Sequence, residues 1–515
     1  MQRRIGIKWL CVFLCFVLLL TMGLTACSSK GEQNTPQPEK ATRSLFCEGM
    51  VAVEKDGQWQ YVDRQGNYVP IGTFEHADNF DANGLALVKL DEKWGYINTK
   101  GEQVVPCQYD DVSMFRSNGL ACVKKDSEWG YINTEGDQVI PCRYESAATG
   151  FAANGLAFVK LDSKWGYINT KGTLVIPCQY DYADTFAANG LAAVCLDGKY
   201  GYINTKGEQV VPCQYDDAQN FADNGLAIVK LDGKYGYINT QGEKVIPCRY
   251  DFAWDFDDNG LAQVMEYGKW GFQDGKLGYI NAKGEQVVPC RYDRVQEFDS
   301  NGLAMVAIRE DSSARANGKA VLLRQSAAVS TAGIHPLMEE APFRGKWGYV
   351  NTKGKVVIPI QYDNADGFAA NGLAAVAKDG KYGYINTKGK QVIPFLYDYA
   401  QRFDADGLAI VKLGGKYGCI NAKGEQVVPC QYDEFYGFAS NGLALALKGN
   451  VGYMIDTSGN VVRQIATEID TVRRPGTYED AYVFGQIYDK YGFKDGVLSI
   501  DGDVLLPPIY DNIAF

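Results

Sequence analysis

The sequence is poor in histidine and lacks the cysteine pairs that bind zinc. Only two histidines, His76 and His335, occur among the 515 residues, and none of the 14 cysteines forms a C-x-x-C pair. Structural zinc sites use about four nitrogen or sulfur ligands, usually paired at short spacings. The sequence therefore predicts no metal site.

The motifs of the common enzyme classes are also missing. The sequence contains no nucleophile elbow, no P-loop, no H-E-x-x-H pair and no dinucleotide-binding glycine pattern. Repeats fill most of the chain and leave little room for a separate catalytic domain. We therefore expect no catalytic residues, no cofactor and no enzymatic activity.

Positive charge is scarce. Lysine and arginine number 51 against 62 acidic residues, which gives a formal net charge of −11. Removing residues 1–26 would take away Arg3, Arg4 and Lys8 and no acid, so the formal charge would become −14. Because no stripe of basic residues recurs either, the composition argues against nucleic acid as a partner.

The one long apolar stretch lies at the N-terminus and is too short to span a bilayer comfortably. Residues 9–20 follow three basic side chains, which is typical of a secretory signal. Leu24-Thr25-Ala26-Cys27 then resembles the bacterial lipobox, in which the signal is cut before a cysteine that carries a lipid. The alternative is an ordinary signal peptide whose cleavage site happens to precede a cysteine.

We accordingly predict a lipoprotein signal peptide over residues 1–26 and lipid attachment at Cys27. Residues 27–47 are polar after the cysteine and lack apolar periodicity, so they are predicted to form a flexible tether. The mature chain would then be held to the cell membrane of a bacterium through its N-terminal lipid, on the extracytoplasmic face.

From about residue 48 the sequence repeats itself with a period of about 35 residues. The landmark N-G-L-A recurs along the chain, beginning at Asn83, Asn118, Asn154, Asn189, Asn224, Asn259, Asn301, Asn371 and Asn441. Modules repeated at this spacing bury their apolar faces against their neighbours. Such arrays commonly serve as binding surfaces.

Each unit predicts three strands and a connector. In residues 225–259, an apolar segment is followed by Asp232-Gly233, which is a strong hairpin signal. A second strand then runs to Asn239, where Asn at the first and Gly at the fourth position of residues 239–242 favour a type I turn. The third strand ends near Pro247, because proline has no N–H to donate. Residues 250–259 suit a single helical turn or a connecting loop.

The internal copies show which positions are exchanged. Apolar residues of several shapes replace one another at the second-strand aromatic position, which favours a packed core row over a sugar-stacking row. That row consists of Trp59, Trp94, Trp129, Trp165, Tyr200, Tyr235, Leu277, Trp347, Tyr382, Tyr417 and Val451. A glycine follows each member except Trp59 and predicts a close backbone approach or a bulge. A phenylalanine in each connector, such as Phe186, is predicted to anchor it to the array.

Two polar rows receive structural interpretations. The cysteines of the P-C-[QR]-Y motif are replaced by Ile360 and Phe395 in other copies, so we expect small buried sites with free thiols. Equivalent cysteines should lie about 10 Å or more apart, beyond the reach of a disulfide. The aspartate after each motif tyrosine, such as Asp181, lacks a D-x-D-x-D context, which favours turn capping over calcium binding.

Two insertions interrupt the period between the first and second strands of a unit. One adds residues around 270–276, and the other spans 309–345. This rim of the array is therefore expected to face solvent. The larger insertion is predicted to be a loosely ordered loop, with a partner-binding role as the alternative.

The motif G-K-W-G-Y-I-N-T-K-G-E-x-V-I-P-x-x-Y-D resembles the WG-repeat family of bacterial proteins. The resemblance covers about residues 48–515 in roughly twelve copies, with degenerate units at both ends. It implies a β-rich scaffold and no particular activity or ligand. A weaker similarity links the Gly-Lys-Trp hairpin to choline-binding wall repeats, which use shorter units with more aromatic residues.

We therefore expect an all-β protein of three-stranded modules stacked in an open superhelical array, with one or two propeller-like rings as the alternative. WG repeats are expected over residues 48–308 and 346–515, on either side of the insertion at 309–345. The expected function is a non-catalytic scaffold that binds another protein of the cell envelope. Binding of carbohydrate or cell wall is the alternative, and the sequence assigns no binding residues.

Overall fold

The computed structural model describes most of the chain from residue 46 onward. The described residues are 46–81, 83–268, 271–309, 343–439, 441–469, 471–473, 481–489, 492–499 and 503–513. They form 48 strands in twelve four-stranded antiparallel sheets, and no helix occurs among them. The prediction of an all-β tandem array is confirmed. The predicted signal peptide, Cys27, the tether and most of the insertion at 309–345 lie outside the described residues.

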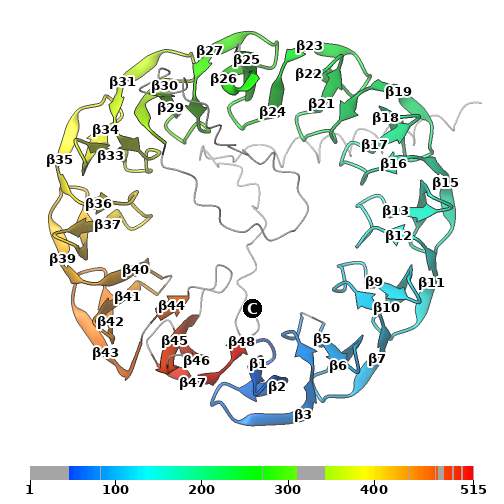
Figure 1. The fold of residues 1–515 in the computed structure, drawn as a ribbon, viewed down its shortest axis with the longest axis horizontal. Helices are drawn as coiled ribbons and strands as arrows, with labels where there is room; N and C mark the ends of the chain where they lie inside the picture. Colours follow the sequence, from blue (N-terminus) through cyan, green and yellow to red (C-terminus); the bar gives the residue numbers. More distant parts are fainter. Residues whose placement is uncertain are drawn as a thin grey trace, which may run out of the picture. The chain divides into compact units, whose positions relative to one another are not determined.

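Every sheet has the same strand order, which we call inner, second, third and outer strand. Figure 1 shows the inner strands towards the middle of the circle of sheets and the outer strands at its circumference. The inner strands are β4 (His76–Ala77), β8 (Asp111–Val112), β12 (Ser146–Ala147), β16 (Tyr182–Ala183), β20 (Asp217–Ala218), β24 (Phe252–Phe256), β28 (Arg294–Val295), β32 (Asn364–Ala365), β36 (Tyr399–Ala400), β40 (Glu434–Phe438), β44 (Thr471–Arg473) and β48 (Asn512–Ile513). The second strands are β1 (Met50–Lys55), β5 (Leu85–Leu90), β9 (Leu120–Lys125), β13 (Leu156–Leu161), β17 (Leu191–Leu196), β21 (Leu226–Leu231), β25 (Leu261–Gly268), β29 (Leu303–Arg309), β33 (Leu373–Lys378), β37 (Leu408–Leu413), β41 (Leu443–Lys448) and β45 (Ala481–Asp489).

The third and outer strands complete each sheet. The third strands are β2 (Gln58–Asp63), β6 (Lys93–Asn98), β10 (Glu128–Asn133), β14 (Lys164–Asn169), β18 (Lys199–Asn204), β22 (Lys234–Asn239), β26 (Gly271–Asn281), β30 (Gly345–Asn351), β34 (Lys381–Asn386), β38 (Lys416–Asn421), β42 (Val451–Asp456) and β46 (Gly492–Ser499). The outer strands are β3 (Tyr68–Phe74), β7 (Gln103–Tyr109), β11 (Gln138–Tyr144), β15 (Leu174–Tyr180), β19 (Gln209–Tyr215), β23 (Lys244–Tyr250), β27 (Gln286–Tyr292), β31 (Val356–Tyr362), β35 (Gln391–Tyr397), β39 (Gln426–Tyr432), β43 (Val461–Glu468) and β47 (Val504–Tyr510). We number the sheets 1 to 12 in chain order, from β1–β3 with β48 to β44–β47.

The two hairpin turns of a unit follow from its turn residues. Asp232 and Gly233 both have positive φ, 52° and 77°, and Leu231 pairs with Lys234 across a two-residue turn. At the next turn the side-chain oxygen of Asn239 accepts hydrogen bonds from the backbone N–H groups of Gln241 and Glu243. Both turns are those predicted from the sequence.

In every sheet except the first, the bulge of the outer strand faces a glycine of the third strand. Tyr235 pairs with Tyr250 but Tyr237 pairs with Ile246, so Gly236 alone faces the three residues between them. A Cβ on Gly236 would lie 2.5 Å from the carbonyl oxygen of Ile246. The prediction of a close backbone approach is confirmed, because only a residue without a side chain fits there.

The connectors differ from the sequence prediction. Residues 250–259 form neither a helical turn nor a plain loop, since they contribute the inner strand β24. Each repeat thus supplies three strands to one sheet and the inner strand to the next, so the sheets have four strands although a unit shows three. The fourth strand went unrecognised because most inner strands have only two residues, too few for an alternating pattern.

The ends of the array meet in one sheet. Val53 and Glu54 of β1 pair with Ile513 and Asn512 of β48, so residues from the C-terminal end complete the first sheet. Buried residues of sheets 12 and 1, including Val497 and Val53, share one apolar cluster. Of the arrangements considered from the sequence, the structure has the single-ring alternative and not the open form, because the last connector occupies the inner position that the first sheet lacks (Figure 1).

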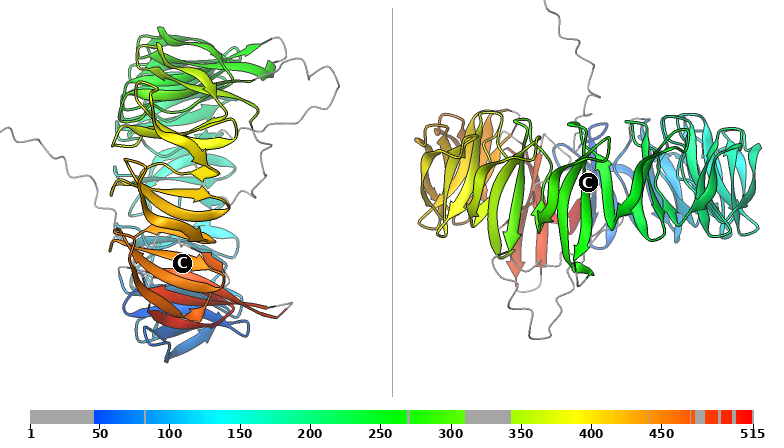
Figure 2. Two further views of the ribbon diagram at one scale, coloured as in Figure 1. Left: turned by 90° about the vertical axis from the view of Figure 1, so that its left-hand side faces the viewer. Right: turned by 90° about the horizontal axis from the view of Figure 1, so that it is seen from above.

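The core is divided among the interfaces between consecutive sheets, which we call seams. At the seam of sheets 5 and 6, Leu191, Tyr202 and Val211 pack against Phe221 and Val229. Seen from the side in Figure 2, the sheets stand next to one another with their strands running between the two faces of the array. The interior of each sheet pair is thus filled, and function must use the edges, turns and connectors.

Candidate interaction surface

A tyrosine of the third strand fastens each of the first nine sheets to the next. The Tyr167 hydroxyl donates a hydrogen bond of 2.7 Å to the carbonyl oxygen of Asp184 in the following connector, and its ring lies 4.8 Å from Phe186. Burial raises the pKa of Tyr167 far above its usual value, so the hydroxyl remains a donor. Equivalent hydroxyl–carbonyl and tyrosine–phenylalanine contacts are made by Tyr61, Tyr96, Tyr131, Tyr202, Tyr237, Tyr279, Tyr349 and Tyr384.

These seam tyrosines explain the phenylalanine row and add residues that sequence reasoning missed. The prediction that a phenylalanine anchors the connector is confirmed at these nine seams, with a tyrosine of the preceding sheet as its partner. Phe438 packs in a cluster with Cys419 instead. The tyrosines themselves were not singled out, although their constancy among the copies was a usable signal: the position departs from tyrosine only at Cys419 and Val497, near the C-terminal end.

The aspartate that follows most outer strands joins two sheets. Asp181 accepts a hydrogen bond from Lys164 Nζ of its own unit and one of 2.7 Å from the backbone N–H of Asp197 in the next hairpin turn. The lysine first, and then this backbone N–H, lower the pKa of Asp181. Equivalent lysine–aspartate clips are formed by Asp110, Asp216, Asp251, Asp293, Asp363, Asp398, Asp433 and Asp511. The prediction that this aspartate caps a turn is confirmed, and the structure adds its pairing with a lysine.

The aromatic row of the third strands is less buried than expected. Trp59, Leu277 and Trp347 are buried, whereas the other members of the row are half-buried. The row runs near the hairpin-turn end of each sheet, where packing from the next sheet is incomplete. Several of its rings carry a lysine ammonium over one face, namely Lys89 over Trp94, Lys124 over Trp129, Lys160 over Trp165, Lys230 over Tyr235 and Lys412 over Tyr417, at 4.6–5.9 Å.

The repeat cysteines are half-buried free thiols. Cys142 Sγ lies 3.8 Å from the carbonyl oxygen of Val123 on the second strand, and burial is the largest cause that raises the pKa of its thiol. Among the described residues all cysteines are free. The expected small apolar slot is thus present at the bulge, although its side chains keep partial exposure.

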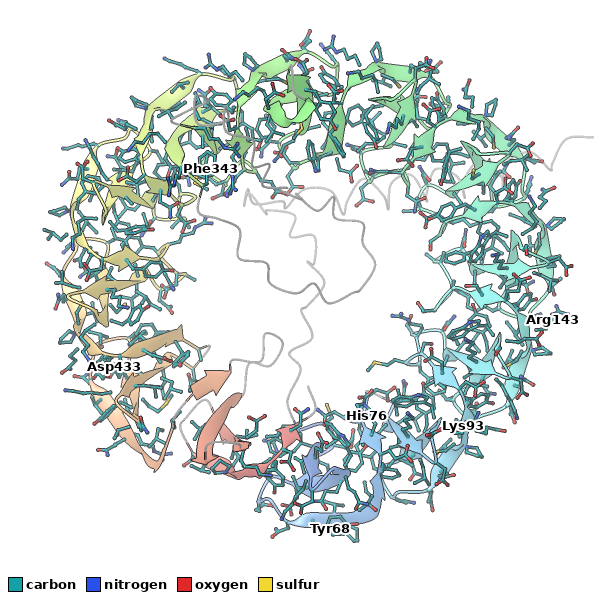
Figure 3. The ribbon with its side chains drawn as sticks, in the orientation of Figure 1. Tyr68, His76, Lys93, Arg143, Phe343 and Asp433 are labelled. Atoms are coloured by element: carbon teal, nitrogen blue, oxygen red, sulfur yellow. The ribbon has the colours of Figure 1, made fainter. Side chains whose placement is uncertain are left out.

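The sequence varies among the copies on the inner rim, which we define as the inner strands and the connectors that follow them. The second inner-strand residue is nearly always alanine or valine, whereas the first changes character from copy to copy. Along the described array it is His76, Asp111, Ser146, Tyr182, Asp217, Phe252, Arg294, Asn364, Tyr399, Glu434 and Asn512. Figure 3 shows His76 on this inner side and Tyr68 and Arg143 at the circumference. The positions packed between sheets keep similar residues in every copy. The inner rim does not, so different sheets can contact different groups there.

A family model decides what kind of repeat this is. The model described as "WG containing repeat" matches residues 61–94, 94–129, 129–165, 165–200, 200–235, 235–270, 278–310, 347–382, 382–417 and 417–451, well over half of the chain. The chain belongs to the WG-repeat family. Apart from 235–270 and 278–310, which end before the third strand of the next sheet, each match runs from the third strand of one sheet to the third strand of the next. A WG repeat of this kind therefore contains a complete seam.

Solved structures with similar strand arrangements are distant from this WG-repeat chain. A structure titled "Crystal structure of the eukaryotic initiation factor" covers 91% of this chain and 97% of its own, at 10% identity and a TM-score of 0.35. The extracellular domain of a putative one component system from B. thetaiotaomicron covers 88% of this chain and 70% of its own, at 11% identity and a TM-score of 0.25. No curated protein matches the sequence.

Two further features are absent from the residues that the structure describes. No group of three or more His, Cys, Asp or Glu side chains there could hold a metal ion. Within the same residues, no helix is long and apolar enough to cross a membrane. The predicted lipid attachment at Cys27 lies outside them.

Proposed function

We propose that this WG-repeat chain is a non-catalytic scaffold, held by a lipid on Cys27 at the extracytoplasmic face of a bacterial cell membrane, that binds another protein of the cell envelope. The observation that carries the proposal is the contrast between constant seams and a variable inner rim. A surface that presents a different side chain on each sheet suits an extended protein partner better than a small repeated ligand.

Carbohydrate binding is the second candidate, because the third-strand aromatic row is half-buried and not fully enclosed. Sugars dock on ring faces, however, and lysines lie over several of these rings. Several of these rings also contact other aromatic rings, such as Trp59 and Trp94, which lie 5.1 and 5.3 Å from His76. These contacts favour the protein scaffold.

The test is a crosslinking capture with the mature protein, residues 28–515. We expect a single envelope protein to be enriched, and we expect its capture to fall when Tyr182 and Tyr399 on the inner rim are replaced by serine. Replacing Tyr68 and Arg143 at the circumference is the matched control and should change nothing. Saturable binding to purified cell-wall glycan, without a captured protein, would replace this proposal with the second candidate.

The anchor is tested separately. A Cys27→Ser variant should be released from the membrane or remain unprocessed. If this variant stays in the membrane fraction as fully mature protein, the lipid-anchor part of the proposal is wrong while the scaffold part stands.

A further inference from the structure

Sheet 7 departs from the other WG sheets at its inner strand. Most inner strands have two residues, whereas β24 runs from Phe252 to Phe256. Ala253 pairs with Val264 and Phe256 with Ala262, so Trp254 and Asp255 together face one residue of β25. Bulges of this kind redirect side chains and are frequent beside functional sites.

The bulge extends an aromatic ladder along the inner rim. The Tyr235 and Phe252 rings are stacked with centroids 5.5 Å apart, and the Trp254 ring lies 5.9 Å from Phe252. The Trp254 carbonyl oxygen is fixed by the Tyr237 hydroxyl at 2.7 Å. Phe252 and Trp254 are both half-buried, so the ladder ends at the surface on a ring whose backbone is held in place.

The same stretch is acidic. Residues 251–261 contain Asp251, Asp255, Asp257 and Asp258 and neither lysine nor arginine. Asp251 is occupied by its clip with Lys234, whereas Asp255 and Asp258 are exposed. Acceptors without donors occur here as well, because Asn220 Oδ1 in the preceding connector and Asp257 Oδ2 are covered and receive no hydrogen bond from the described residues.

The neighbouring connectors do not neutralise this charge. Residues 217–225 contain Asp217 and Asp223 and no basic residue, and residues 294–302 contain one, Arg294. The Arg294 guanidinium lies over the Phe343 ring, with its central carbon 4.8 Å from the ring centroid. Three consecutive connectors therefore present carboxylates around one aromatic ladder.

We propose that the Trp254–Asp258 bulge and turn of sheet 7 bind an arginine-rich extended segment of a protein partner. This inference rests on the proposed scaffold function and names its partner chemistry. Arginine is the side chain that both stacks on an aromatic ring and pairs with carboxylates in a plane. The chain already shows the attraction, since Lys230 Nζ lies 5.0 Å over Tyr235 at the other end of the same ladder.

An extended segment fits this place because the contacts follow an edge strand. β24 is the first strand of its sheet, so its inner edge has no further strand of that sheet beside it. Trp254, Asp255, Asp257 and Asp258 follow one another along this edge and the turn after it. An extended peptide with arginine at alternate positions would contact these four side chains in succession, and its positive charge is opposite to that of the protein.

Sheet 11 supplies an internal control. Its inner strand β40 has the same length and the same type of register shift, between Phe435 and Phe438. At the bulge it carries Tyr436 and Gly437 in place of Trp254 and Asp255. The aromatic bulge is therefore present there with glycine in place of Asp255. The nearby Glu434 carboxylate already accepts a hydrogen bond from the Tyr436 hydroxyl, so this bulge should bind cations less well.

The probe is a short fluorescent peptide of alternating arginine and glycine, compared with its lysine counterpart, in fluorescence anisotropy with residues 28–515 at about 150 mM salt, where distant charges are screened. We expect saturable binding and a preference for arginine. Asp255→Asn with Asp258→Asn should weaken binding about tenfold, and Trp254→Leu about fivefold with loss of the arginine preference. Tyr436→Leu and Asp406→Asn, an exposed aspartate of the corresponding turn in sheet 10, should leave affinity unchanged.

Equal weakening by Asp406→Asn would show general attraction to an acidic protein and would overturn the inference, as would absence of binding. Thermal unfolding of each variant separates loss of binding from loss of fold. If an envelope protein is captured equally well by the Asp255/Asp258 double variant, the inference fails and the scaffold function stands. If no protein is captured while the arginine peptide binds at sheet 7, the scaffold function fails instead.

Discussion

The seams between the early sheets and the seam that closes the ring are built differently. At the early seams a buried tyrosine, such as Tyr167, bonds the next connector and packs on its phenylalanine. At the closing seam Val497 stands at the tyrosine position, and the two-residue pairing of β48 with β1 completes the sheet. The aspartate clip is kept, because Asp511 bonds Lys494 and the backbone N–H of Asp56.

This difference separates what a sheet needs from what a seam needs. The hairpins, the bulge and the clip recur along most of the array. The hairpins and the bulge therefore belong to the sheet itself, and the clip is the common link between one sheet and the next. The tyrosine–phenylalanine contact is found at the early seams, which join sheets that are consecutive in the sequence. The closing seam joins the two ends of the chain and lacks the buried tyrosine hydrogen bond, because Val497 stands at that position, so we expect it to be the first to open.

Deleting residues 511–515 should have the largest effect. It removes the β48–β1 pairing, the Asp511 clip and Ile513, whose side chain is 1% exposed in the closing cluster. Loss of a buried isoleucine alone costs about 2–5 kcal/mol. We expect a lower urea midpoint and increased hydrogen exchange in β1–β3 and β44–β47. If exchange rises equally in sheets 5 and 6, the closing seam is not the weak point.

Gly236→Val should destabilise an early sheet by about 2–3 kcal/mol, because its Cβ would clash with backbone atoms of the outer strand that cannot move independently. Gly367→Ala is the matched control, since the nearest atom to a Cβ there is Arg402 Nη1 at 3.7 Å. Equilibrium unfolding measures both. Equal stability of the two variants would contradict the requirement for glycine at the bulge.

Tyr167→Phe should cost about 1 kcal/mol, because it leaves the Asp184 carbonyl oxygen without its buried donor while keeping the ring contact. Tyr182→Phe removes an exposed hydroxyl from the next inner strand and should be neutral. A tyrosine hydroxyl that contributes nothing at position 167 would remove the main distinction between early and closing seams.

Much of this architecture was predictable because the repeats compare the chain with itself. Asp232-Gly233, Gly236 and the phenylalanine anchors were interpreted correctly, since each depends on local geometry or on a constant residue type. The inner strands were missed because two residues carry no period. Ring closure was only the alternative prediction, because it depends on how Asn512 and Ile513 meet a strand more than 450 residues away.

The candidate surface was less predictable than the fold. The aromatic row was expected in the core, and the structure leaves members such as Trp94 half-buried, because burial depends on how far the next sheet covers the row. The Trp254–Asp258 bulge had no distinctive sequence motif. Its only signal is a difference from the other copies: residues 251–261 contain a tryptophan and acidic residues where small or amide side chains are common.

The smallest effects should come from the clips, and they should depend on pH. Hydrogen bonds from Lys164 and from the Asp197 N–H lower the pKa of Asp181, and Lys494 followed by the Asp56 N–H lowers that of Asp511. A carboxylate whose pKa is lowered by folding stabilises the folded state at all pH values above the unfolded value, about 4, and loses this contribution as the pH falls through the folded value. Stability should therefore be flat near neutrality and fall below about pH 4.

Asp181→Asn and Asp511→Asn measure how much the clip of an early seam and the clip of the closing seam each contribute to this acid dependence. Each should lower the urea midpoint at pH 7 by less than Tyr167→Phe does, because the lysine is exposed and screened by solvent. Asp511→Asn should have the greater effect. The seam of Asp181 is also stabilised by a tyrosine hydrogen bond, which the closing seam lacks because Val497 stands at that position. Both variants should also lose stability less steeply below pH 4 than the parent, whereas Asp223→Asn, an exposed connector aspartate, should follow the parent. Equal effects at Asp181 and Asp511 would mean that the closing seam is as strong as the others and that the missing tyrosine is compensated by the apolar cluster around Val497.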